Sequence, residues 1–484
     1  MGIGRRYAGG SDGFEMRNKT SRLATAAAIS MLLAGCASFS PDGGFGKVSE
    51  LTRERTGQAV APQRTDAESD AARKRVAELL EAPLTPETAV EIALANNRGL
   101  QAKFADLGIA EADQVRAGRL KNPSFRFGRL GGGGDVEIDR AVLFDVLGLL
   151  TLPLATEVGQ RRFEQAQVQA AADAVGLAAE ARRAYFDAVA AQERARYDEQ
   201  VKEAADASSE LARRMLQAGN VHKLAQMREQ AFQAEATAQL ARARHQAIAQ
   251  KERLTRLLGL SGEQANFRLP DRLPELPKQP AEARDAERVA MEQRLDVLIA
   301  KRNADATARS LGLTKATRFV NVLDIGYQNR SETGKPLAEG YEIELELPLF
   351  DFGATRAARA EAVYMQAVHR TAEIAVNARS EVRESWSAYR TAYDLAKHYR
   401  DEVVPLRKQI SEENLLRYNG MLIGPFELLA DAREQVASVT AAMQALRDYW
   451  VAETNLQMAL TGGSPAAASL SQPAADATAP AAGH

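Results

Sequence analysis

Residues 340–350 read Gly-Tyr-Glu-Ile-Glu-Leu-Glu-Leu-Pro-Leu-Phe, and their alternation decides which folds the chain can adopt. Every second side chain from position 341 to 349 is apolar, and three of the side chains between them are the carboxylates Glu342, Glu344 and Glu346. Because successive side chains of a β-strand point to opposite faces, the stretch predicts a strand with one apolar and one acidic face. The apolar face needs a protein core or lipid, and in a membrane barrel the three glutamates would face a water-filled lumen.

The first half of the chain contains a similar pattern at residues 136–146, where apolar and acidic side chains alternate and Arg140 interrupts the apolar side. A further strand-like stretch precedes each of these two, at residues 125–130 and 318–330. In the later stretch the apolar parity switches after Val322, which predicts a β-bulge. The sequence therefore predicts two strand pairs, one in each half of the chain.

The two strand pairs belong to a longer repeat. Three matches carry it: Leu100–Leu154 with Leu295–Leu349 without gaps, Glu180 and Arg182 with Glu381 and Arg383, and Arg228-Glu229-Gln230 with Arg433-Glu434-Gln435. A period of about 200 residues is far longer than the repeats of solenoid proteins. We therefore expect one duplicated unit, with copies at residues 84–280 and 281–463.

Each copy predicts helices around its strand pair. Thr85 is the expected N-cap of the first helix, which would run to Leu120. The helical pattern resumes after Pro153 in the first copy and after Gly353 in the second, where only Pro405 interrupts it. About 65 helical residues extend for roughly 100 Å, which is too long for a single globular core.

The two ends of the chain have their own patterns. Arg17, Lys19 and Arg22 precede an apolar run, which predicts a signal peptide over residues 1–35 with Met16 as the true start. Residues 36–83 are polar and are expected to form an extended, lipidated tether. Residues 464–484 are rich in Ala and Pro and predict a disordered tail.

The signal ends in Leu33-Ala34-Gly35-Cys36, which resembles the lipobox of bacterial lipoproteins. The resemblance implies that Cys36, the only cysteine of the chain, carries lipid, with palmitate among its acyl groups. Ala37 and Ser38 follow where an aspartate would favour retention in the inner membrane. The resemblance therefore implies a lipid-anchored protein of the cell outer membrane.

Composition excludes several classes of function. The chain has 62 basic and 64 acidic side chains, so its net charge of −2 predicts no nucleic-acid partner. Its five histidines show no paired ligand spacing, and we expect no metal site, no cofactor and no catalytic site. Beyond the signal we find no run of about 18 apolar residues, so any membrane crossing would fall to the strands.

Four strands in one chain cannot close a membrane barrel, because open sheet edges are not tolerated in hydrocarbon. Oligomerisation is therefore required, and three chains would supply twelve strands. The expected fold class is an α+β membrane protein, a homotrimer with a twelve-stranded β-barrel in outer-membrane lipid. The long helices would continue this barrel as a periplasmic α-helical barrel.

The order of lipobox, helix, strand pair, very long helix, turn and shorter helix, present twice, resembles the TolC-like outer-membrane factor family over residues 84–463. The lipobox places the resemblance in its lipoprotein branch. It implies the passive exit duct of a tripartite efflux system, coupled through a periplasmic adaptor to an inner-membrane pump. Small solutes, either drugs or metal ions, are the favoured cargo, and the resemblance implies no enzyme activity.

The family has an Arg-Tyr pair and a glycine at its second periplasmic tip, followed by an aspartate on the returning helix. Here the corresponding residues are Arg417-Tyr418-Asn419-Gly420 and then Asp431. The resemblance implies that two tips contact the adaptor, through Gly219, Asn220, Gly420, Gly424 and Pro425, and glycine there would permit a positive φ. Glu427 and Asp431 share a helix face and form the candidate acidic gate.

Two alternatives stay open. The chain could be a periplasmic coiled-coil adaptor or scaffold lipoprotein, which should have one helical hairpin flanked by small β domains. It could also be the exit channel of a type I protein-secretion system. The duplicated strand pair favours a channel over a scaffold. For Glu427 an ordinary solvated helix face explains the residue equally well.

Overall fold

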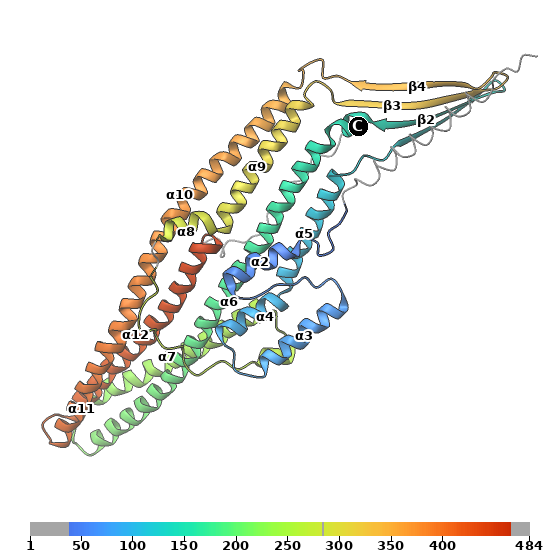
Figure 1. Cartoon of the computed structure of the whole chain (residues 1–484). Coiled ribbons are helices and arrows are strands. Elements are labelled where there is room, and N and C mark those ends of the chain that lie inside the picture. The colour runs from blue at the N-terminus through green and yellow to red at the C-terminus, as the bar shows by residue number, and fades with distance from the viewer. Residues whose placement is uncertain (1–37, 283–284, 466–484) are drawn as a thin grey trace, which may run out of the picture. The chain divides into compact units, whose positions relative to one another are not determined.

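A computed structural model of the chain describes residues 38–282 and 285–465. They form two compact units (Figure 1). Among the described residues, the sheet unit contains 38–43, 109–163 and 306–364, and the hairpin unit contains 44–108, 164–282, 285–305 and 365–465. Each unit takes segments from both halves of the chain. Cys36, the signal segment and most of the Ala/Pro-rich tail lie outside the described residues.

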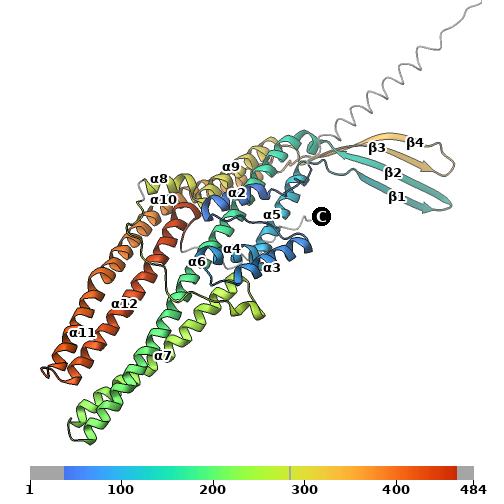
Figure 2. The same ribbon diagram turned by 60° about the horizontal axis from the view of Figure 1, so that its bottom comes forward.

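The sheet unit is built on one antiparallel sheet in which the strands lie in the order β1-β2-β3-β4 (Figure 2). Their bounds are β1 Ser124–Gly132, β2 Asp135–Asp145, β3 Val322–Glu332 and β4 Ala338–Glu346. Leu143 of β2 pairs with Gly326 of β3, so the strand pairs of the two chain halves join into one sheet. A Cβ at Gly326 would meet the Val142 carbonyl oxygen at 2.3 Å, so only glycine fits this central position.

Several strand and turn predictions need correction. β4 ends at Glu346, so Leu347 and Leu349 lie beyond the strand. β3 starts at Val322 and pairs regularly with β4, so the expected bulge is wrong.

The gapless alignment of the two halves is also wrong. It would place the turn glycine Gly134 opposite Asn329, in the middle of β3, whereas the corresponding turn glycine of the second hairpin is Gly334. Leu152-Pro153-Leu154 is helical, whereas Leu347-Pro348-Leu349 is not.

Four helices have residues in both units. They are α5 Arg98–Ala117, α6 Val146–Gln217, α9 Leu295–Ala316 and α10 Ala354–His398. The prediction that α10 starts after Gly353 is confirmed, and the prediction that the first long helix starts after Pro153 is wrong. The Asp145 carboxylate accepts a hydrogen bond from the Gly148 N–H at 2.6 Å, which caps the helix eight residues before Pro153.

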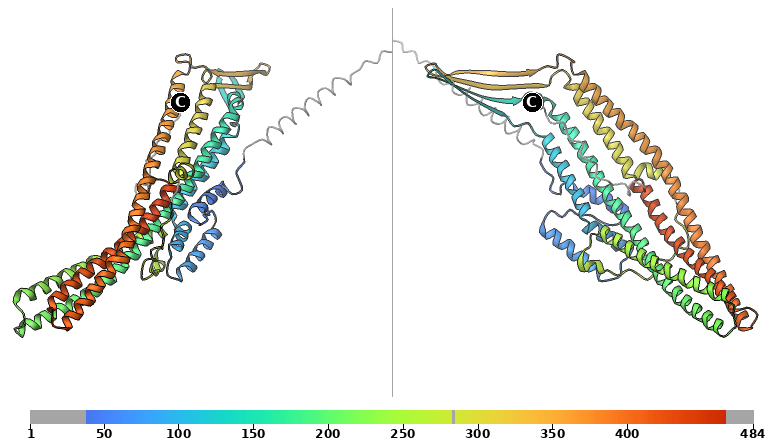
Figure 3. Two further views of the ribbon diagram at one scale, coloured as in Figure 1. Left: turned by 60° about the vertical axis from the view of Figure 1, so that its left-hand side comes forward. Right: turned by 180° about the vertical axis from the view of Figure 1, so that it is seen from behind.

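The hairpin unit contains most of the helices (Figure 3). Its own elements are α2 Phe45–Thr56, α3 Asp66–Leu80, α4 Pro86–Asn96, α7 Lys223–Leu258, η1 Gly262–Asn266, α8 Ala286–Gln293, the π turn η2 Tyr399–Val403, α11 Val404–Asn419, α12 Pro425–Gln457 and the π turn η3 Met458–Gly462. Two antiparallel helical hairpins form its main body, α6 with α7 and α11 with α12. None of the helices in residues 38–282 and 285–465 has both the length and the apolar character that a membrane crossing requires.

The prediction that Thr85 is an N-cap is confirmed, since its Oγ1 accepts a hydrogen bond from the Thr88 N–H at the start of α4. The expected single helix to Leu120 is instead two helices, α4 and α5, separated at Asn97. The Asn97 amide donates to the Leu257 carbonyl at 2.9 Å, and its Oδ1 accepts from the Leu100 N–H at 2.9 Å. These bonds replace helical bonds at the break.

The second half has a matching break at Arg294, between α8 and α9. Arg294 is only 1% exposed. Its guanidinium lies 2.6 Å from the Asp296 carboxylate and 2.7 Å from that of Glu381. A buried cation is tolerated because both carboxylates contact it.

The expectation of an extended tether at residues 36–83 is wrong for α2 and α3. The Thr65 side chain and Glu68 form a capping box at the start of α3. Val48 of α2 and Val76 of α3 are fully buried. The polar composition of these residues predicts a tether, because α2 and α3 each bury only a few side chains.

Aromatic side chains form the centre of the hairpin unit. Phe186 of α6 stacks on Trp450 of α12 with ring centroids 5.3 Å apart. Tyr449 of α12 contacts Tyr389 and Tyr393 of α10 at 5.6 and 5.8 Å. Each aromatic pair adds roughly 1 kcal/mol to the free energy of apolar burial, so this region holds the three long helices together.

Candidate functional site

The sheet has a continuous apolar face. Directly paired residues of antiparallel strands share a face, and Tyr341 pairs with Tyr327 while Ile343 pairs with Ile325. The exposed large side chains of this face are Phe125, Phe127, Phe144, Ile325, Tyr327, Tyr341, Ile343 and Leu345. Tyr341 is 78% exposed, so the described part of the chain leaves it largely uncovered. A contiguous apolar face of this kind marks a contact with lipid or protein.

The apolar face is a band with two different ends. Toward the helices, exposed apolar residues continue beyond the strands, at Leu149, Leu150, Leu349 and Phe350. Toward the hairpin turns, the face becomes polar where Arg140 donates to the Asn329 Oδ1 at 3.2 Å. The Arg140 interruption noted in the sequence therefore lies at the edge of the band.

The opposite face of the sheet is acidic. Glu342, Glu344 and Glu346 lie on it together, as the alternation predicts. The further carboxylates of this face are Glu137, Asp139, Asp145, Asp324 and Glu332, and its two cations are Arg126 and Arg330. Arg330 pairs with Asp139 at 2.7 Å.

Arg126 shows how the sheet is curved. It lies on β1, and its Nη1 is 2.6 Å from the Glu342 Oε1 on β4, which is the other outer strand. In a flat sheet the two strands would be roughly 14 Å apart. The contact therefore requires the sheet to curve toward its acidic face, which makes that face concave.

The first hairpin tip lies between α6 and α7. Gly219 has a φ of 76°, as expected for glycine at this turn. Its N–H donates to the Leu216 carbonyl at 3.0 Å, and the Asn220 N–H donates to the Met215 carbonyl at 2.9 Å. These two bonds form a Schellman motif, a common end of helices.

The second tip, between α11 and α12, differs from the expectation. Gly420 has a φ of −79° and Gly424 a φ of −83°, so the expected positive φ at the tip glycine is wrong for both. Met421 has the positive φ instead, at 60°. Gly424 is the N-cap of α12 and Pro425 its first residue, a position where the missing N–H of proline costs nothing.

The two candidate gate residues have different surroundings. Glu427 is exposed in the first turn of α12, and its N–H donates to the Gly424 carbonyl at 3.2 Å. Asp431 is half-buried, and its Oδ2 is shielded from water with no hydrogen-bond partner in the described chain. Four residues apart, they lie on one side of α12 as predicted, but only Glu427 is exposed.

A buried polar contact near the tips escapes the sequence reading. Glu229 of α7 is 2% exposed, and it accepts a hydrogen bond from the Ser208 hydroxyl of α6 at 2.5 Å. It also pairs with Arg433 of α12, whose guanidinium covers the Phe232 ring at 4.4 Å. The contact joins the two helical hairpins. The sequence repeats Arg-Glu-Gln at residues 228–230 and 433–435, and these two stretches include Glu229 and Arg433. That alignment matches Glu229 with Glu434, however, so it does not predict the pair between Glu229 and Arg433.

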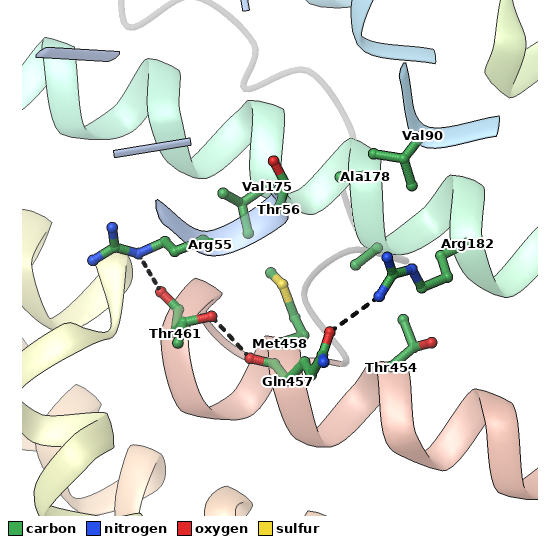
Figure 4. A pocket seen from close by; sticks show the side chains of 11 residues that line it. Arg55, Thr56, Val90, Val175, Ala178, Arg182, Thr454, Gln457, Met458 and Thr461 are labelled. Carbon is green, nitrogen blue, oxygen red and sulfur yellow. Dashed lines mark hydrogen bonds between the residues drawn. The ribbon is translucent and has the colours of Figure 1, made fainter. Parts of the chain in front are cut away.

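The hairpin unit also holds a small pocket (Figure 4). Its volume is about 40 Å³, enough for water and too small for a solute. The Arg55 Nε donates to the Thr461 carbonyl at 3.1 Å, and the Arg182 Nη1 donates to the Gln457 Oε1 at 3.2 Å. Burial lowers the pKa of Arg55. The two guanidinium groups therefore join α2 to η3 and α6 to α12.

A larger open hollow of about 670 Å³ lies between α5, α6, α9 and α10 in the hairpin unit. Lys103 and Asp173 on its wall pair at 2.7 Å. Across residues 38–282 and 285–465, no group of three or more His, Cys, Asp or Glu side chains could hold a metal ion. The surfaces with a distinct chemical character are therefore the two faces of the sheet and the two hairpin tips.

Comparison with known proteins gives a consistent fold. No sequence-family profile matches the chain, and no curated protein matches it. Among solved structures, the outer-membrane channel OprN has a TM-score of 0.67 at 21% identity, covering 80% of this chain and 92% of that one.

Two further channels agree. The Campylobacter jejuni CmeC outer-membrane channel gives a TM-score of 0.68 at 15% identity, covering 78% of this chain and 86% of that one. The open Neisseria gonorrhoeae MtrE outer-membrane channel gives 0.63 at 16%, covering 78% and 89%. The chain therefore has the fold of these outer-membrane channels, and the TolC-like architecture predicted from the sequence is confirmed as a fold.

Proposed function

We propose that this chain, which has the TolC-like fold of outer-membrane channels, is the passive exit duct of a tripartite efflux system and acts as a homotrimer. One observation carries the proposal. A single curved sheet exposes an apolar band on its convex face and gathers carboxylates on its concave face. Lipid on the outside and water on the inside satisfy both faces at once.

Three copies would close the barrel. The outer edges of β1 and β4 have no strand partner within the described chain. Open edges are not tolerated in hydrocarbon, so these edges would pair with neighbouring copies, and three copies give twelve strands. Glu342, Glu344 and Glu346 would then line a water-filled lumen, and the long helices would extend this duct into the periplasm.

The two hairpin tips would contact a periplasmic adaptor, which links the duct to an inner-membrane pump. Gly219 and Asn220 form the first contact, and Gly420, Gly424 and Pro425 belong to the second. Three copies of Glu427 and Asp431 would form an acidic gate beside the tips. The half-buried carboxylate of Asp431 supports a constricting role, because a movement of α12 that widened the duct would change the exposure of this carboxylate.

Lipid on Cys36 would anchor each copy to the outer membrane. The favoured cargo is a small solute, either a drug or a metal ion, delivered by the pump. The duct would bind it only weakly, because a passive exit path must release what the pump delivers. Chemistry at the duct is not required, which agrees with the channel proteins that share the fold.

Reconstitution in planar lipid bilayers tests the proposal. We expect the mature chain to purify in detergent as a trimer and to give stepwise ionic conductance. A channel-deletion strain carrying the gene should regain solute efflux, whereas protein secretion restored without solute efflux would favour the type I role. A detergent-independent protein without conductance would contradict the proposal and support the scaffold alternative.

A further inference from the structure

The two hairpin tips are built on the same backbone turn with different side chains. At the second tip the Met421 N–H donates to the Tyr418 carbonyl at 2.9 Å, and the Leu422 N–H donates to the Arg417 carbonyl at 2.8 Å. This is the Schellman motif found at Gly219 in the first tip. Met421 therefore occupies the position that glycine occupies 202 residues earlier.

A methionine is unfavourable at this position. The motif needs a left-handed residue, and both tips provide one, with a φ of 76° at Gly219 and 60° at Met421. Glycine adopts this conformation freely, whereas a Cβ crowds the neighbouring carbonyl. The bonds of the turn are all made by the backbone, so the Met421 side chain is not needed to hold it. A strained residue that the fold does not require indicates a function.

The side chains at the second tip are apolar and open to solvent. Met421 is 93% exposed, Leu422 is 77% exposed, and Leu416 is also exposed. No charged residue lies between Arg417 and Glu427. The first tip is different, since Asn220-Val221-His222-Lys223 follows its glycine. The apolar apex is thus a property of the second tip alone.

We infer that Met421, supported by Leu422, is the side chain that anchors the second tip in an apolar pocket of the adaptor. The inference rests on the proposed function and names the chemistry of its partner. Methionine is flexible and polarisable, so it suits a pocket whose shape adapts on binding. The first tip would then meet a polar part of the same adaptor.

Other occupants fit the apex less well. A second copy packed alongside would need an apolar stripe along the helices, whereas Met421 and Leu422 lie in the turn at the end of the α11–α12 hairpin (Figure 2). A lipid surface would favour an amphipathic helix with basic residues beside its apolar side chains. The basic residue nearest in the sequence, Arg417, already pairs with Glu413 at 3.3 Å.

The test is the Met421→Gly variant, which removes the side chain and relieves the backbone. We expect its trimer to melt at the same temperature as the wild type or higher, with unchanged conductance in planar bilayers. Its affinity for the purified adaptor, taken from the pump whose efflux the wild-type channel restores, should fall about tenfold or more. Met421→Leu keeps an apolar side chain and should bind within about threefold of wild type.

Asn220→Gly at the first tip is the matched control, and its adaptor affinity should change less than that of Met421→Gly. If Met421→Gly binds the adaptor as tightly as the wild type, the inference about Met421 is wrong. If this variant still conducts ions in bilayers, the proposed channel function is unaffected by that result. Loss of the trimer in Met421→Gly would instead assign the apex to contact between copies. Weaker binding to anionic vesicles with unchanged adaptor affinity would assign it to lipid. A wild-type protein without trimer or conductance would defeat the proposed function itself.

Discussion

Arg126 and Glu342 form an ion pair of 2.6 Å across the concave face of the sheet, although they lie on its two outer strands. The pair connects the first strand of one repeat with the last strand of the other. The sheet of a single chain is therefore curved without any contact to a neighbouring copy. The curvature and the acidic face therefore arise from the same set of residues.

Removing the concave carboxylates should change ion selectivity. The triple variant Glu342→Gln, Glu344→Gln and Glu346→Gln deletes negative charge from the proposed lumen, so we expect the permeability ratio of K⁺ to Cl⁻ to fall several-fold. Reversal potentials in a KCl gradient measure this ratio. Glu339→Gln, on the same strand but on the other face, is the control and should leave the ratio unchanged.

Charge on the convex face should block membrane assembly. Ile343→Lys places an ammonium in the apolar band and should cost about 2–4 kcal/mol if that residue meets lipid. Glu344→Lys, one residue along, faces the concave side and should be tolerated. The yield of membrane-inserted trimer, measured by native electrophoresis, distinguishes them. Equal yields from the two variants would show that the band does not face lipid.

The buried pair between the helical hairpins should matter for stability. Glu229→Ala leaves the Arg433 guanidinium without its carboxylate, and we expect a loss of about 2 kcal/mol because Arg433 keeps part of its contact with water. Glu235→Ala on the same helix removes an exposed pair with Arg242 and an exposed hydrogen bond from Gln239, and should cost less than about 1 kcal/mol. Urea unfolding of the two variants gives the comparison. Similar losses would mean that Glu229 does not join the hairpins.

Stability should also depend on Glu453. Burial raises the pKa of this carboxyl, against the opposing effect of Arg182. The folded state therefore holds a proton more tightly than the unfolded state, and stability falls as the pH rises through the range above the ordinary glutamate pKa.

We expect Glu453→Gln to remove this decline, so that the variant is more stable than the wild type at pH 8. Melting temperatures of wild type and variant between pH 5 and pH 8 provide the measurement. Parallel curves over this range would contradict the assignment.

Much of the fold can be predicted from local patterns that tertiary contacts do not override. Alternation at residues 341–346 defines β4 and its two faces, because a strand has only two sides. The Thr85 cap fixes the start of α4 through a bond to a residue three positions away. Such signals are complete within a few residues, so a sequence reading captures them.

The failures have physical causes as well. Asp145 belongs to β2 and also caps α6, so an acidic strand residue concealed the helix start. Helices α2 and α3 bury few side chains, and their polar sequences resemble a tether. The repeat drifts from 197 residues at the helix breaks Asn97 and Arg294 to 202 residues at the tips, so a gapless alignment could not follow it.

The tips illustrate a limit of residue-type rules. Glycine is the residue type that a left-handed turn favours, and the sequence places Gly420 at the expected position of the tip. The strained position falls on the next residue, Met421, because Gly420 still continues the end of α11. The turn type was predictable, whereas the residue that carries the strain was not.

The bond from Arg55 to the Thr461 carbonyl joins residues 406 positions apart. During synthesis, Arg55 emerges from the ribosome long before its acceptor exists. This contact of α2 can therefore form only after nearly the whole polypeptide is made, and closing so long a loop is slow. The contact between α2 and η3 would therefore be among the last to form in each copy. Until it forms, this side of α2 would stay accessible to chaperones.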